Sequence, residues 1–164
     1  MEKMVLYGEN TGMPTRVLYS EKEGMAYTLD VGEPIEEIII SEGYHFLGFI
    51  GDTIDPEDLA KMLGVLFANT GDYRHMASIA RHRINVSGLK VATRQFVLEI
   101  KIVKTGDRDF PWKLEIKEKM TGRVFFTMPD LEEWEYGKTL ATWFMSALTE
   151  MGVNLDFNYR IERQ

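Results

Sequence analysis

The residues best suited to chemistry lie in a segment without acids, residues 73–98, which is called the basic segment below. Its five cations are Arg74, Arg81, Arg83, Lys90 and Arg94. The guanidinium of arginine can hold a phosphate through two parallel hydrogen bonds, and a stretch free of carboxylates suits an anionic ligand. The segment therefore predicts an anion site, for a nucleotide or a single-stranded nucleic acid. The alternative is that its cations pair with acids elsewhere. Because the segment contributes +5 to a net charge of −7, the remainder carries −12.

A second candidate lies in residues 129–152, whose spacing predicts a helix with two apolar stripes. One stripe contains Trp134, Ala141, Phe144, Met145, Leu148 and Met151, and a helix on a sheet needs only that one. The other contains Tyr136, Leu140, Trp143 and Ala147. It is covered by the final strand, by the sheet of the other half, or by another molecule. Tyrosine and tryptophan dominate interface energies, so Tyr136, Leu140 and Trp143 are predicted to bind protein.

Other chemistry has little basis in the residues. There is no Gly-x-Ser-x-Gly motif and no cysteine, so a serine or thiolate nucleophile is not predicted. Of the three histidines, His75 and His82 are seven residues apart, about 10 Å along a helix, which is too far for one metal ion. The acids between Asp52 and Asp58 are interpreted as a helix start. We predict no catalytic residue, no metal site and no cofactor.

Composition indicates an ordinary globular protein. The 164 residues are 45% apolar and 27% charged, so one compact domain over 1–164 is expected, with 1–82 and 83–164 as candidate halves. Net charge −7 opposes non-specific binding to nucleic acid or to an anionic membrane. No run of about 18 apolar residues and no secretory signal is found. We expect a cytoplasmic protein that does not interact with membranes, and the absence of cysteine fits that compartment.

The first half reads as strands followed by helices. Strands are predicted over residues 4–8, 16–20, 25–31, 35–40 and 44–50. The last two are apolar on both faces, which favours a central position in the sheet. Asp55 as cap and Pro56 at the first helical position begin a helix that ends near Asn69. A short helix is predicted from Tyr73 to about His82.

The second half repeats this order. The apolar residues fall at odd positions in Leu89 and Val91 but at even positions from Phe96 to Ile102. A break in the strand is therefore predicted over 92–95. Strands follow at 96–102, 112–117 and 124–128. Asp130 is predicted to cap the next helix, with Glu133 completing a capping box and Gly152 ending it. Residues 153–161 alternate as a final strand. The two long helices superpose at an offset of 81 residues, which raises the hypothesis of internal duplication.

These patterns predict an α+β fold: two antiparallel β-meanders, each followed by an amphipathic helix, with a C-terminal strand. The leading functional hypothesis is a non-catalytic protein that binds a protein partner or itself, as an inhibitor, immunity or accessory protein does. Ten methionines suit adaptable binding surfaces, although core packing also uses them. The alternative is binding of single-stranded nucleic acid or a nucleotide through the basic segment.

Overall fold

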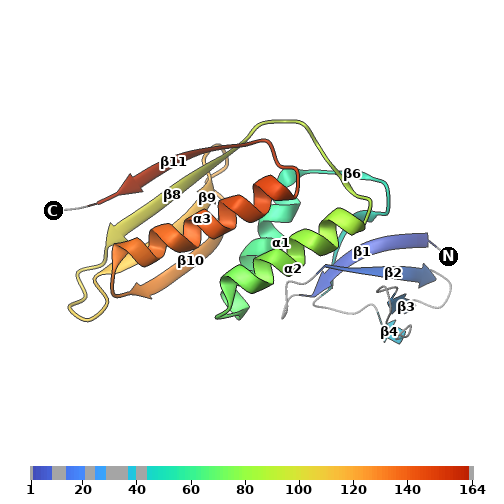
Figure 1. The fold of residues 1–164 in the computed structure, drawn as a ribbon, viewed down its shortest axis with the longest axis horizontal. Coiled ribbons are helices and arrows are strands. Elements are labelled where there is room, and N and C mark those ends of the chain that lie inside the picture. The colour runs from blue at the N-terminus through green and yellow to red at the C-terminus, as the bar shows by residue number, and fades with distance from the viewer. Residues whose placement is uncertain (1, 9–13, 21–24, 29–36, 40–43, 163–164) are drawn as a thin grey trace.

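The computed structural model describes residues 2–8, 14–20, 25–28, 37–39 and 44–162. The fold is α+β, as predicted. A five-stranded sheet comes from the first half and a four-stranded sheet from the second. Figure 1 shows helices α1 and α2 between the two sheets, with α3 lying along the second sheet. Buried residues of both sequence halves form one continuous apolar cluster, so the sheets share a core.

The first sheet is antiparallel, and its fifth strand returns to pair with the first. Its strands are β1 (Glu2–Gly8), β2 (Pro14–Ser20), β3 (Met25–Thr28), β4 (Glu37–Ile39) and β5 (Tyr44–Phe49), in the order β4-β3-β2-β1-β5. The prediction that the last two strands are central is wrong, because they form the two edges. On β5, Leu47 is buried, but Phe46 and Phe49 are exposed and contact each other edge to face. The predicted strand ends at 29–31, 35–36 and 40 lie outside the described residues.

The second sheet has the order β10-β9-β8-β11. Its strands are β8 (Phe96–Lys104), β9 (Trp112–Glu118), β10 (Val124–Leu131) and β11 (Leu155–Ile161), and only β11 pairs in parallel, with β8. Along β8 the alternation is complete, because Phe96, Leu98, Ile100 and Ile102 are fully buried. Its other face carries Val97, Glu99, Lys101 and Val103 and is partly exposed, with Lys101 3.0 Å from Glu99. The predicted break over 92–95 is confirmed and separates β8 from β7 (Lys90–Val91), which pairs in parallel with β6 (Thr53–Ile54).

Helix α1 (Pro56–Asn69) begins as predicted. Asp55 is its cap and accepts a hydrogen bond from the Glu57 N–H at 2.9 Å. The buried face packs against β10 of the second sheet. At Gly64 the approach is so close that an added Cβ would overlap the carbonyl oxygen of Phe125. A helix of the first half is thereby seated on a strand of the second, which explains the shared core.

Helix α2 (Tyr73–Val86) is longer than the predicted helix, which ended at about His82. Ala77, Ala80 and Ile84 are buried along its length. Residues 72–87 contain no glycine or proline, and φ is +76° at Gly88, so nothing in the sequence of α2 stops the helix earlier. The extra turn lets α2 run beside α3 (Trp134–Glu150).

The start of α3 differs from the prediction. Asp130 belongs to β10, and Glu133 is the cap residue, although its side chain makes no capping hydrogen bond. The reason is that Leu131 still pairs with Trp112 in the sheet, so the backbone cannot turn helical earlier. The end is as predicted, because Gly152 follows the helix with φ of +99°. Gly71, at the matching position after α1, lacks a positive φ.

We expect Gly64→Ala to destabilise the protein by roughly 2 kcal/mol or more, as overpacking of a close contact does. Alanine should gain about 1 kcal/mol of helix propensity, but the Phe125 backbone cannot yield as a flexible side chain would. Urea denaturation followed by circular dichroism measures the change. Gly71→Ala is the matched control, because no atom lies within 4 Å of its added Cβ. Equal stability of the two variants would contradict the proposed close contact.

Candidate functional site

Helix α2 lies beside α3 on the side of the second stripe, and it is none of the three covers expected from the sequence. Near one end Arg81 of α2 lies 2.7 Å from Glu150. Near the other end burial raises the pKa of the Tyr73 hydroxyl, and the neighbouring Tyr136 raises it further. Leu140, between these contacts, is 0% exposed. The expectation that Leu140 contacts a partner is therefore corrected: it is a core residue.

The other two residues of the predicted contact reach the surface. Tyr136 is 44% exposed. Trp143 is half-buried and packs against the edge of the core. Tyr136 and Trp143 thus reach solvent, whereas Leu140 does not.

Tyr136 lines a groove of about 340 Å³ at the start of α3. Phe110, from the loop between β8 and β9, forms another wall and is 39% exposed. That loop is held by its own residues: the Phe110 N–H donates to Asp107 at 3.0 Å, and the Thr105 hydroxyl donates to the Phe110 carbonyl at 2.7 Å. The N–H groups of Phe110 and Asp109 lower the pKa of Asp107. Sequence reasoning missed Phe110, although Asp107 is a residue type that orders such turns.

The remaining wall of this groove is acidic. It contains Asp130, Glu132 and Glu133. None of the three forms an ion pair with a described cation. The groove therefore combines two exposed aromatic rings with three carboxylates that have no ion-pair partner among the described residues.

Trp143 borders a second hollow, on the outer side of α3. This hollow measures about 350 Å³ and is lined by Trp134, Glu135, Lys138, Thr139, Thr142 and Trp143. Two half-buried indoles and two hydroxyls give it a mixed character. Tyr136 and Trp143 are thus each at the rim of a separate depression along one helix.

Most of the basic segment is engaged inside the fold. Arg94 makes two hydrogen bonds to Asp55, from Nε at 2.9 Å and from Nη2 at 2.7 Å, and lies 3.8 Å from buried Glu118. Arg81 pairs with Glu150, and Arg83 donates to the Pro14 carbonyl at 3.4 Å. Arg94 is thus the counter-ion of a buried carboxylate, and its loss would leave that charge unpaired.

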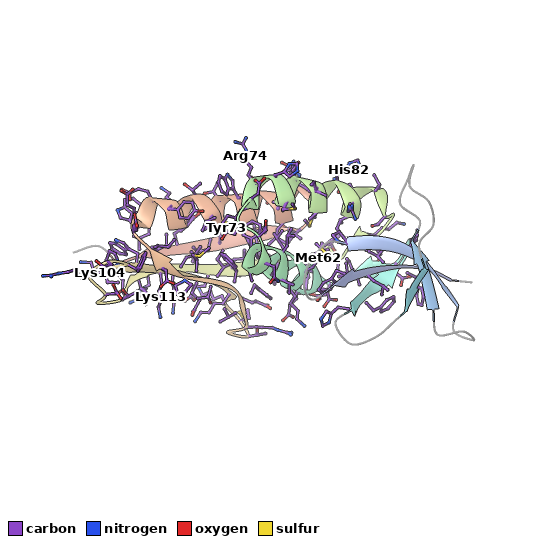
Figure 2. All side chains as sticks on the ribbon, turned by 90° about the horizontal axis from the view of Figure 1, so that it is seen from below. Met62, Tyr73, Arg74, His82, Lys104 and Lys113 are labelled. Carbon is purple, nitrogen blue, oxygen red and sulfur yellow. The ribbon has the colours of Figure 1, made fainter. Side chains whose placement is uncertain are left out.

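The two other cations of the segment do not converge. Arg74 and Lys90 are exposed, one at the start of α2 and the other beyond its end. A rise of 1.5 Å per residue separates the ends of α2 by about 20 Å. Figure 2 shows Arg74 and His82 pointing away from the sheets. The fold thus disperses the basic segment, and anion binding by it stays a prediction.

The histidines are also dispersed. His45 stacks on Tyr7 with ring centroids 4.9 Å apart, and His75 and His82 are exposed on α2. Within the described ranges, no group of three or more histidine, aspartate or glutamate side chains is placed to hold a metal ion. No helix in the part of the chain that the structure describes is long and apolar enough to cross a membrane.

The Arg94–Asp55 pair makes stability depend on pH. Hydrogen bonds from Arg94 lower the pKa of Asp55, and the pKa of Arg94 is raised in return. Because the folded pKa of Asp55 lies below its unfolded value, the pair stabilises the fold above about pH 4. That contribution is lost as pH falls through the folded pKa. Partial burial and the Asp55 charge raise the pKa of Asp58. The ionised form of Asp58 therefore lowers the stability of the fold, which is opposite in sign to the contribution of Asp55.

We expect Asp55→Asn to cost about 0.5–1 kcal/mol at pH 7, because the pair is partly exposed and asparagine still caps the helix. The variant should also lose less stability than the wild type between about pH 5 and pH 3. Urea unfolding across this range measures both effects. Asp109→Asn, at an exposed loop position, serves as the control. Identical pH profiles for wild type and Asp55→Asn would show that the pair contributes nothing.

Comparison of the chain with protein-family models, with curated proteins and with solved structures gives no match.

Proposed function

We propose that the protein is a non-catalytic binder of another protein, in the manner of an inhibitor, immunity or accessory protein. Its contact surface is the α3 face, defined here as Phe110, Tyr136 and Trp143. The observation that carries the proposal is the groove at the start of α3, where two exposed aromatic rings stand beside three carboxylates that pair with no described cation. Aromatic side chains in a shallow depression are the common anchors of protein interfaces.

The chemistry of the groove specifies the partner segment. Asp130, Glu132 and Glu133 favour a cationic segment, and Phe110 and Tyr136 favour an aliphatic stem or a ring. Arginine supplies both, because its guanidinium stacks on aromatic faces and pairs with carboxylates. A basic segment of a protein partner fits this groove better than a nucleic acid, whose phosphates the acids repel.

We expect Tyr136→Asp to abolish partner binding while the fold is kept, because this ring is 44% exposed. The test is affinity purification from the native host with mass spectrometry, repeated after nuclease treatment. Ser146→Asp is the matched control, since it adds the same charge at an exposed position of α3 outside the α3 face. Circular dichroism checks the fold of each variant. Trp143→Glu is less decisive, because Trp143 also packs against the core.

The proposal fails if both variants recover the same proteins as the wild type. It also fails if the recovered material disappears on nuclease treatment. That second result would instead favour the alternative of nucleic-acid binding. Retention of a labelled oligonucleotide that weakens with added salt would then identify the ligand class.

A further inference from the structure

Strand β11 is an edge of the second sheet, and no described strand pairs with its outer side. It pairs with β8 over all seven of its residues without a register shift. In Figure 1 it forms the outer border of that sheet, on the side away from β9 and β10. Proteins usually protect such an edge with a bulge, a proline or charged side chains, lysine above all. The sequence Leu-Asp-Phe-Asn-Tyr-Arg-Ile has no proline or lysine, and its two charged side chains, Asp156 and Arg160, have opposite signs.

The hydrogen bonds of β11 show which backbone groups face outward. The Asn154 carbonyl accepts from Phe96, and the Glu162 N–H donates to Ile102, both at 2.9 Å. Even-numbered residues therefore point their backbone groups at β8, and odd-numbered residues point theirs outward. Consistent with this, the Phe157 N–H bonds not to β8 but to the side chain of Asp156, at 2.9 Å.

The sequence of β11 is complementary to itself when reversed about Asn158. Antiparallel pairing of two copies about that residue sets Leu155 opposite Ile161 and Phe157 opposite Tyr159. It also sets Asp156 opposite Arg160. The odd-numbered residues, whose backbone groups face outward, then form the hydrogen-bonded pairs. The charged residues fall in non-hydrogen-bonded pairs, where opposite side chains are closest.

We propose that two copies of this chain pair antiparallel through β11, about a two-fold axis at Asn158. The two four-stranded sheets then form one continuous eight-stranded sheet. The surface is distinct from the α3 face and does not depend on the proposed function. In the dimer the Phe157 N–H donates to the Tyr159 carbonyl of the second copy, and Asp156 is released to pair with Arg160.

Charge complementarity selects this register from its neighbours. A two-fold axis at Phe157 would set Asp156 opposite Asn158, and an axis at Tyr159 would set Arg160 opposite Asn158. Only the axis at Asn158 joins the two opposite charges, and it does so twice because of the symmetry. Within the described part of the single chain, Arg160 lies 3.6 Å from exposed Glu162.

The aromatic residues of β11 support the same pairing. Phe157 is 47% exposed, and its ring meets Tyr159 edge to face with centroids 5.6 Å apart. Both side chains lie on the face of the sheet that carries α3. In the dimer, these rings of both copies meet across the axis. The exposed apolar surface at this edge is then covered by its own counterpart.

Charge substitutions test the register. We expect Arg160→Asp to weaken the dimer by about tenfold or more, because it sets acidic side chains opposite each other at two symmetric positions. The double variant Asp156→Arg, Arg160→Asp exchanges the charges and should restore the dimer. Sedimentation velocity over a concentration series measures association, and circular dichroism checks the fold. A wild type that stays monomeric at about 100 μM, or a dimer that Arg160→Asp leaves unchanged, would overturn the proposal.

A cysteine probe tests the axis itself, and the absence of native cysteine makes it specific. At the axis the two Cα atoms of residue 158 should lie about 4.5 Å apart, within the range for a disulfide. We expect Asn158→Cys to form a disulfide-linked dimer under mild oxidation. Asn85→Cys, exposed on α2, is the control and should stay monomeric. Equal cross-linking of both variants, or none at residue 158, would rule out this axis.

Discussion

The structure depends on the close contact between Gly64 of α1 and the Phe125 carbonyl of β10. Because the glycine has no side chain, the helix comes near enough for Phe67 to reach the second half. The ring of Phe67 meets Phe126 and Phe144 edge to face, each with centroids 5.5 Å apart. One aromatic cluster therefore joins α1, β10 and α3, and it fixes α1 on the second sheet.

The position of α1 determines what the other helices can cover. With α1 on β10, α2 lies beside α3 and contacts β2 of the first sheet. It buries Leu140 and anchors Glu150 through Arg81. Only the start of α3 and its outer side stay open, which is where Tyr136 and Trp143 meet solvent. The part of α3 in the proposed binding face is thus the part that neither the second sheet nor α2 covers.

The charges follow the same logic. Arg94 pairs with Asp55, the cap residue of α1, and lies close to the buried Glu118. Arg123, in the turn between β9 and β10, pairs with Glu57 at 3.1 Å. These pairs fasten the start of α1 to the second sheet. Asp130, Glu132 and Glu133 lie beside Phe110 and Tyr136 and pair with no described cation, so the groove is negatively charged. Strand β11, at the opposite edge of the second sheet from β10, carries Asp156 and Arg160 in a self-complementary arrangement.

The sequence by itself determined the features that depend on neighbouring residues. Asp55 and Pro56 begin α1, Gly152 ends α3, and the alternation of Phe96 to Ile102 gives a half-buried strand, because caps and periodicity act within a few residues. Tertiary structure decided the rest. Periodicity shows that Leu140 must be covered but not by which element, and an apolar strand such as β5 can still lie at an edge. The partners of Arg81 and Arg94 are 69 and 39 residues away, and only the fold brings such distant charges together.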